Sequence, residues 1–201
     1  MQVKVESLQV AGKSNASSAH QSKKRYSLRA SKMTTELYAQ PYNRDAKGFN
    51  FKDMAQYQVQ ANNRLDGYGN LVEEFEIQFI DGDDSELFKA CQIDQTNLDT
   101  WYDEIESLDE FDKLNLYYLT TVAGYTLSDA LLKIEEPSIQ YQPLIDAATE
   151  LFDECYTNEI PVNIRFYIDY NKFARDCELN GDLVEFEYQN RTYTCTNAAG
   201  L

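Results

Sequence analysis

The chain is poor in the residues on which most catalytic and metal sites depend. It has one histidine, His20, near the N-terminus, and its four cysteines form no CxxC pair. Histidine is a frequent general base and zinc ligand, so histidine catalysis and a zinc site are both disfavoured. The cysteines are expected to be reduced thiols in a cytoplasmic protein. No cofactor is predicted.

Long apolar runs and nucleotide-binding motifs are also missing. No apolar run approaches the roughly 18 residues that a membrane span needs, and the basic, serine-rich N-terminus lacks the apolar stretch of a signal peptide. The sequence contains neither GxGxxG nor a phosphate-binding loop. We therefore expect no membrane segment, no secretion and no nucleotide site.

Acidic residues are plentiful, yet they match no catalytic or calcium-binding template. An EF-hand loop that began at Asp81 would need glycine at its sixth position and glutamate at its twelfth, where this chain has Glu86 and Gln92. Carboxylate pairs of the glycosidase type arise by chance among so many acids, and no pair is singled out. The sequence therefore predicts neither an enzyme nor a metal site.

Basic residues are few, and they are separated from the acidic ones along the chain. Residues 1–33 hold seven Lys or Arg and one Glu, whereas residues 34–201 hold 11 basic and 33 acidic residues. The first segment has too few large apolar residues for a core, so we predict a flexible basic arm. The alternatives for this arm are a disordered extension without a function, a segment that contacts nucleic acid, and a segment that folds onto the acidic body. A body this negative repels nucleic acid and anionic membranes and attracts basic surfaces.

The negative charge is densest between Glu73 and Asp112, which we call the acidic segment. It contains fifteen acidic residues and one basic residue, Lys89, and large apolar residues such as Phe75 and Trp101 are interleaved with them. A disordered acidic tract lacks such residues, so we interpret the segment as a folded surface that holds negative charge at fixed positions. Solubility in a salt-rich cell is the alternative use of the charge. The residues of the predicted surface are Glu73, Glu74, Glu76, Asp81, Asp83, Asp84, Glu86, Asp94, Asp99, Asp103, Glu104, Glu106, Asp109, Glu110 and Asp112.

Hydrophobic periodicity predicts an α+β fold with three small units after the arm. The first unit, residues 34–93, combines a helix over about 52–64, capped by Asn50, with a strand over 71–80 in which acidic and apolar residues alternate. An aspartate in the turn that follows can cap a second helix.

The second unit, residues 94–138, is predicted to be helical. Apolar residues over 98–108 recur at helical spacing on one face, and acidic residues form a row on another face. Extended over about 16 Å, this row spaces its carboxylates comparably with the phosphates of one DNA strand. Asp109 can instead cap a new helix and interrupt the row. The row consists of Asp99, Asp103, Glu106 and, if the helix continues, Glu110.

The third unit, residues 139–201, is predicted to be α+β. An apolar stripe indicates a helix over about 144–155, and a second helix over 168–179 ends at Asn180-Gly181. Two strands then form a hairpin over Gln189-Asn190.

This third unit carries the most specific sequence motif. The run Tyr167-Ile168-Asp169-Tyr170-Asn171-Lys172-Phe173-Ala174-Arg175-Asp176, followed by Gly181-Asp182-Leu183-Val184, resembles the C-terminal signature of the ArdA antirestriction proteins. That signature is Ile-Asp-Tyr, an aromatic, a small residue and Arg-Asp, and then a Gly-Asp turn into a strand. Glu73-Glu74-Phe75-Glu76-Ile77 looks like the family's Glu-Glu-aromatic-x-Ile strand, and Tyr38 with Tyr42-Asn43 is similar to its opening strand and loop. The likeness spans about residues 35–190.

The resemblance implies an elongated, curved α+β protein of three small domains in a row. It implies a homodimer formed through the third domain, and a function as a mimic of bent B-DNA that blocks the DNA groove of type I restriction-modification enzymes. Phages, plasmids and transposons use such proteins to survive in a new host. Ordinary core packing is the alternative to self-association for the aromatic residues of the motif. The motif residues are Tyr167, Ile168, Asp169, Tyr170, Phe173, Arg175 and Asp176.

Two other partners fit an acidic surface. One is a different DNA-binding target, such as a CRISPR effector or a nucleoid protein. The other is a basic protein that uses the chain as an acidic interaction module without any DNA mimicry. Competition distinguishes them, because a mimic displaces duplex DNA from its partner and a simple acidic module need not.

Overall fold

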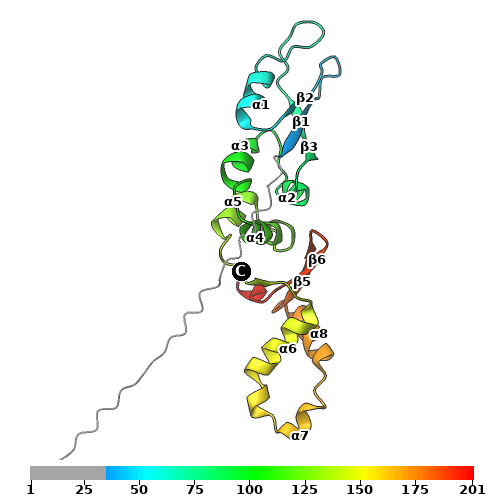
Figure 1. The fold of residues 1–201 in the computed structure, drawn as a ribbon, viewed down its shortest axis with the longest axis vertical. Helices are drawn as coiled ribbons and strands as arrows, with labels where there is room; N and C mark the ends of the chain where they lie inside the picture. The colour runs from blue at the N-terminus through cyan, green and yellow to red at the C-terminus, as the bar shows by residue number, and fades with distance from the viewer. Residues whose placement is uncertain (1–34) are drawn as a thin grey trace, which may run out of the picture. The chain divides into compact units, whose positions relative to one another are not determined.

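The computed structural model describes residues 35–201, and the predicted arm over residues 1–33, with His20, lies outside them. Within the described residues the fold is α+β, as predicted, with two small antiparallel sheets and several helices (Figure 1). None of these helices is long and apolar enough to cross a membrane. The division of the body into three units stays a prediction.

The first sheet has the strand order β2-β1-β3, with antiparallel pairing throughout. Strand β1 (Glu36–Pro41) lies between β2 (Phe49–Phe51) and β3 (Phe75–Asp81). The chain enters β2 through Gly48, where a Cβ atom would lie 2.6 Å from the backbone carbonyl oxygen of Ala39. Only glycine allows so close an approach, which is what lets β2 pair with β1.

Helix α1 (Met54–Ala61) follows β2 and buries Tyr57. Its N-terminus corrects the predicted cap. Asn50 lies within β2, so the chain is still extended there, and the helix begins only after Asp53. The Asp53 carboxylate accepts the backbone N–H of Gln56 at 2.7 Å and so supplies the cap.

Short helical segments connect the two sheets. The helix predicted over 98–108 is shorter, because after one turn it widens into a π-helical turn. The backbone N–H of Glu106 closes that turn by donating to the Trp101 carbonyl oxygen at 2.8 Å. The segments are α2 (Ser85–Ala90), α3 (Leu98–Thr100), the π-helical turn (Trp101–Ile105), α4 (Glu110–Thr121) and α5 (Leu127–Leu132).

Asp109 separates the π-helical turn from α4. Its carboxylate accepts the backbone N–H groups of Phe111 and Asp112, each at 3.0 Å, and caps α4. The acidic row predicted from Asp99 to Glu110 is therefore divided between two helical segments, which is the alternative that the sequence left open.

The second sheet has the strand order β4-β6-β5, again antiparallel. Its strands are β4 (Ile139–Gln140), β5 (Val184–Tyr188) and β6 (Arg191–Cys195). The predicted hairpin is confirmed, and its turn residues Gln189 and Asn190 have φ of 50° and 58°. Two consecutive left-handed residues match the right-handed twist of paired strands.

Helices α6 (Leu144–Cys155) and α8 (Tyr170–Asn180) lie side by side, with α7 (Val162–Arg165) in the connection between them (Figure 1). The helix predicted over 144–155 is confirmed. Helix α8 begins two residues later than predicted, because Asp169 caps it by accepting a backbone N–H of the first turn at 3.1 Å. Short 3₁₀ turns cover Thr157–Glu159 and Ala198–Gly200.

Two clusters of buried apolar residues hold the described body together. The larger cluster is continuous from β1 through the π-helical turn and α4 to β5, and it includes Leu37, Trp101, Leu119 and Tyr188. The smaller cluster lies between α6 and α8 and consists of Ala147, Ala148, Ala174, Cys177 and Leu183. The acidic segment is thus backed by the larger cluster, whereas α6 and α8 share a small one.

Candidate acidic interaction surface

The structure places the predicted surface residues at three levels of exposure. Twelve of the fifteen carboxylates are exposed, Glu106 and Asp112 are half-buried, and Asp84 is buried. We call the fourteen carboxylates other than Asp84 the acidic surface. The exposed members are Glu73, Glu74, Glu76, Asp81, Asp83, Glu86, Asp94, Asp99, Asp103, Glu104, Asp109 and Glu110.

The start of strand β3 alternates buried apolar and exposed acidic residues. Phe75 and Ile77 are buried, and Glu76 between them is exposed. The loop around Gln95 holds the start of this strand. The Gln95 side-chain oxygen accepts the Phe75 N–H at 2.7 Å, and its Nε2 donates to the Glu73 carbonyl oxygen at 2.8 Å. The backbone that carries the first acidic residues is therefore fixed from a second segment.

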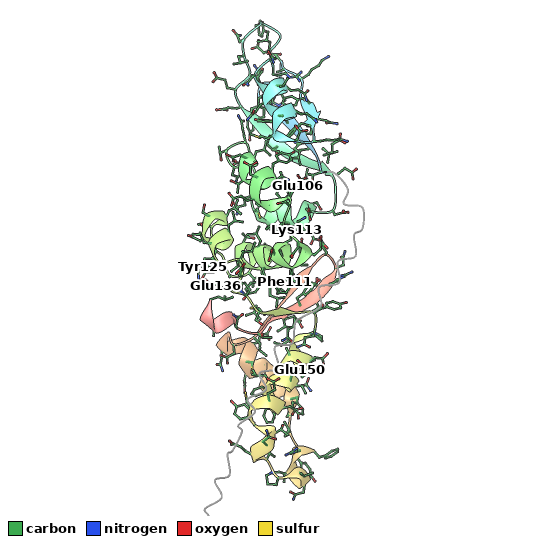
Figure 2. The ribbon with its side chains drawn as sticks, turned by 60° about the vertical axis from the view of Figure 1, so that its left-hand side comes forward. Glu106, Phe111, Lys113, Tyr125, Glu136 and Glu150 are labelled. Carbon is green, nitrogen blue, oxygen red and sulfur yellow. The ribbon has the colours of Figure 1, made fainter. Side chains whose placement is uncertain are left out.

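Asp84 corrects the predicted surface. Its carboxylate forms an ion pair with the Nζ of Lys113, a residue of α4 labelled in Figure 2, and the two side chains are 4% and 1% exposed. The two opposite charges offset each other, so Asp84 adds no net charge to the acidic surface. Burial raises the pKa of the nearby Tyr188, and the negative charge of Asp84 raises it further.

Asp94 holds the local backbone as well as a surface charge. Its carboxylate accepts the Thr96 hydroxyl at 2.6 Å and the Thr96 backbone N–H at 2.7 Å. These hydrogen bonds lower the pKa of Asp94 because they favour the ionised form. Like the cap at Asp109, this carboxylate has a fixed orientation and is not a loose side chain.

The π-helical turn presents Asp103 and Glu104 to solvent while Trp101 is fully buried. The hydroxyl of Tyr102 is buried without a hydrogen-bond partner among the described residues. Burial raises the pKa of Tyr102, and the negative charges of Glu106 and a second carboxylate add to the effect. The same backbone turn therefore packs the core and concentrates negative charge.

The predicted self-association motif is divided between exposed and packed residues. Tyr167 is 80% exposed, and its neighbour Phe166, which no sequence pattern singled out, is 90% exposed. Phe173 instead packs edge-on against a phenylalanine of α6, with 5.0 Å between ring centroids. The hydroxyl of Tyr170 donates to Asp153 at 2.8 Å. Of the other motif residues, Ile168 is half-buried, and Asp169, Arg175 and Asp176 are exposed.

The part of the chain that the structure describes contains no group of three or more His, Cys, Asp or Glu side chains that could hold a metal ion. An open pocket of about 530 Å³ lies between α6, α8 and the C-terminal turn, with Cys155, Cys177 and Asp176 among its lining residues. None of the lining residues belongs to the acidic segment. The pocket therefore lies apart from the residues of the acidic surface.

One comparison with known proteins gives a family. The family model described as antirestriction protein (ArdA) matches residues 45–190, well over half of the chain. Neither a curated protein nor a solved structure matches the chain. The matched range contains the whole acidic segment and the whole self-association motif. The chain therefore belongs to the ArdA family of antirestriction proteins, the family that its sequence motifs resemble.

Proposed function

We propose that this antirestriction protein is a mimic of bent B-DNA that occupies the DNA-binding groove of type I restriction-modification enzymes. Its partner is the methyltransferase and specificity core of such an enzyme, in the cytoplasm of a bacterial host. Family membership supports the antirestriction role. The observation that carries the mechanism is the acidic surface, in which twelve exposed carboxylates come from one stretch of 40 residues on a continuous core.

The physical basis of the proposal is an exchange of one polyanion for another. The DNA-binding groove of an enzyme is lined with Lys and Arg side chains that neutralise phosphates. Carboxylates on a folded scaffold carry the same sign of charge as those phosphates. Binding is then steered by the electric field and weakened by salt. Because bases have no counterpart on this surface, target choice comes from shape and curvature, as in indirect readout.

Rigidity supports the same proposal. A flexible polyanion would lose affinity to the entropy of ordering its side chains and loops on binding. Here the backbone that carries the carboxylates is held by the Gln95 side chain, by the Asp109 cap and by the buried Trp101. The charges are positioned before the target arrives.

The proposal includes a homodimer formed around α7. The exposed apolar residues of this region are Val162, Ile164, Phe166 and Tyr167, and the first, third and fourth are at least 78% exposed. Neighbouring large apolar side chains at such exposure are typical of an interface, and the small core between α6 and α8 leaves them uncovered.

Displacement of DNA tests the proposed function. Labelled duplex is first bound to a purified type I methyltransferase–specificity complex, and the full chain is then titrated in at 50 and at 200 mM salt. We expect release of the duplex, with an apparent affinity that falls at least about tenfold at the higher salt. The control is the duplex without enzyme, to which the chain should not bind.

Two outcomes would redirect the proposal. Binding of the chain to the enzyme with the duplex still in place would contradict mimicry and favour the simple acidic module. No effect on the type I enzyme, together with displacement of DNA from a CRISPR effector or a nucleoid protein, would keep mimicry and change the target.

A further inference from the structure

Helix α2, in the middle of the acidic surface, is held by the tip of the C-terminal hairpin. The carboxylate of Glu86 accepts the backbone N–H of Gln189 at 2.8 Å, although 103 positions separate the two residues in the sequence. The Gln189 side chain also lies 3.4 Å from the Asp83 carbonyl oxygen and 3.3 Å from the Tyr188 hydroxyl. Residues on both sides of the α2 N-terminus therefore contact the hairpin.

The same helix is held from a second direction. Asp84 occupies the N-cap position of α2, but its side chain makes no capping hydrogen bond and pairs instead with the buried Lys113 of α4. Hydrogen bonds thus connect three of the four residues 83–86 to elements that come later in the chain. The three are Asp83, Asp84 and Glu86.

The hairpin tip adopts an unfavourable backbone conformation at the contact. Gln189 has φ of 50°, a region where a residue with a Cβ atom is strained and where asparagine or glycine is usual. Such strain persists only where the surrounding contacts compensate for it. The contacts here are those with Glu86, Asp83 and Tyr188.

We propose that Glu86 is a positioning residue of the acidic surface as well as one of its charges. Its hydrogen bond to the Gln189 N–H fixes α2 on the hairpin, and this sets where the carboxylates of α2 and of the preceding turn stand relative to those of α4. This inference rests on the proposed function, because it assigns to the C-terminal hairpin a role in presenting the DNA-mimicking surface. Hairpin residues that are far from the acidic segment in the sequence then influence how tightly the acidic surface binds the target enzyme.

Two substitutions at Glu86 separate position from charge. Glu86→Gln removes the charge but keeps an oxygen that can accept the Gln189 N–H, whereas Glu86→Ala removes both. We expect Glu86→Gln to weaken inhibition of the type I enzyme by about threefold, the effect of one exposed charge. We expect Glu86→Ala to weaken it by at least about tenfold, because it also releases α2 from the hairpin.

The matched control is Glu104, an exposed carboxylate for which the structure gives no hydrogen bond within residues 35–201. Glu104→Gln and Glu104→Ala should weaken inhibition equally, since only a charge is lost. Equal inhibition by the two Glu86 variants, as for the Glu104 pair, would overturn the inference. Thermal melting of all four variants shows that each is folded.

Hydrogen exchange of the Gln189 amide gives a readout that does not depend on the target. The amide should be protected in the parent chain and in Glu86→Gln, and should exchange at least about tenfold faster in Glu86→Ala. If the parent chain fails to inhibit the enzyme, the proposed function fails. The exchange result still shows whether the hydrogen bond between the Gln189 N–H and Glu86, which we call the tether, holds the hairpin on α2. Unchanged exchange in Glu86→Ala would refute the tether itself.

Discussion

The acidic segment and the region of α6 to α8 differ in the kind of side chain that they expose to solvent. In the acidic segment, large apolar residues such as Trp101 and Leu98 are fully buried, and most of the charged side chains left outside are carboxylates. Around α7 the order is reversed, because Phe166 and Tyr167 are exposed over a cluster made mostly of alanines. The first surface presents mainly charged groups to water, whereas the second presents large aromatic side chains to water.

The size of the core behind each region explains the difference. The larger cluster receives residues from both sheets and from α4, so it buries most of the bulky side chains of the acidic segment, with Ile80 and Phe111 as the exposed exceptions. The smaller cluster has five buried residues, and Ala147, Ala148 and Ala174 contribute little apolar area. A region with so small a core gains most from a partner that covers its aromatic residues.

Charge reversal in the acidic segment should have the largest effect on function. Changing five exposed acids to lysine should abolish inhibition, because a basic target groove would then meet positive charge. Since all five are exposed, melting should show a folded protein. Inhibition of DNA cleavage by a type I enzyme is the measurement. The five residues are Glu74, Glu76, Asp83, Asp103 and Glu104.

A second set of five reversals shows whether position matters or only total charge. It changes the net charge by the same amount but lies between residues 146 and 187, outside the acidic segment, so we expect weaker inhibition and not its loss. Equal loss in both sets would contradict a localised mimic. The residues of the control set are Asp146, Glu154, Glu159, Glu178 and Glu187.

Removal of the buried cation should have the largest effect on stability. Lys113→Met leaves Asp84 buried without its partner, which should cost about 3–5 kcal/mol of unfolding free energy. The double variant Asp84→Leu/Lys113→Met removes both charges and should stay close to the parent. Chemical denaturation measures both. Similar stabilities for the single and double variants would show that the ion pair does not hold α2 and α4 together.

Polar substitution around α7 tests the other half of the comparison. Phe166→Ser/Tyr167→Ser should turn a dimer into a monomer in light scattering, because the apolar area that drives association is gone. The unfolding midpoint of the monomer should change little, as both side chains are exposed. A parent chain that is already monomeric at high concentration would remove the proposed interface.

The smallest expected effect concerns Asp94 and pH. Thr96→Val removes the hydroxyl that donates to Asp94, so the pKa of Asp94 should rise toward its ordinary value. In the parent, the lowered folded-state pKa stabilises the fold above the unfolded-state pKa, and this contribution disappears as pH falls through the folded-state value. The variant should therefore be slightly less stable at neutral pH and equal to the parent in strong acid. NMR titration of the Asp94 carboxyl carbon gives the pKa directly, and a pKa unchanged by the substitution would contradict the role of Thr96.

Elements that depend on neighbouring residues could be predicted from the sequence. The alternation around Phe75 and Ile77 predicted β3, the apolar stripe over 144–155 predicted α6, and Gln189-Asn190 predicted the hairpin. In each of these the information lies within a few residues. The strands β2 and β4 were missed because two or three residues are too few to show a period.

Features that depend on distant residues could not be predicted. Asp84 was counted as a surface charge because its partner Lys113 is 29 residues away, and only the folded chain brings them together. The tether from Glu86 to Gln189 spans 103 positions. The exposure of Phe166 was also invisible, since an aromatic residue in a sequence suggests core until the size of that core is known. Local patterns therefore predicted the exposed carboxylates, whereas the burial of Asp84 and the contacts that support the acidic surface follow from tertiary structure.

The continuous packing between α4 and the C-terminal hairpin limits how this gene could be cut or recombined. The rings of Tyr117 and Tyr188 lie 4.5 Å apart between centroids, and Tyr118 contacts Phe186 at 5.0 Å. A fragment that stopped after residue 138 would leave the tyrosines of α4 facing water and would be prone to aggregate. Fusions and chimaeras of this protein should therefore keep its last strands with its middle helices, even where the acidic portion alone is wanted.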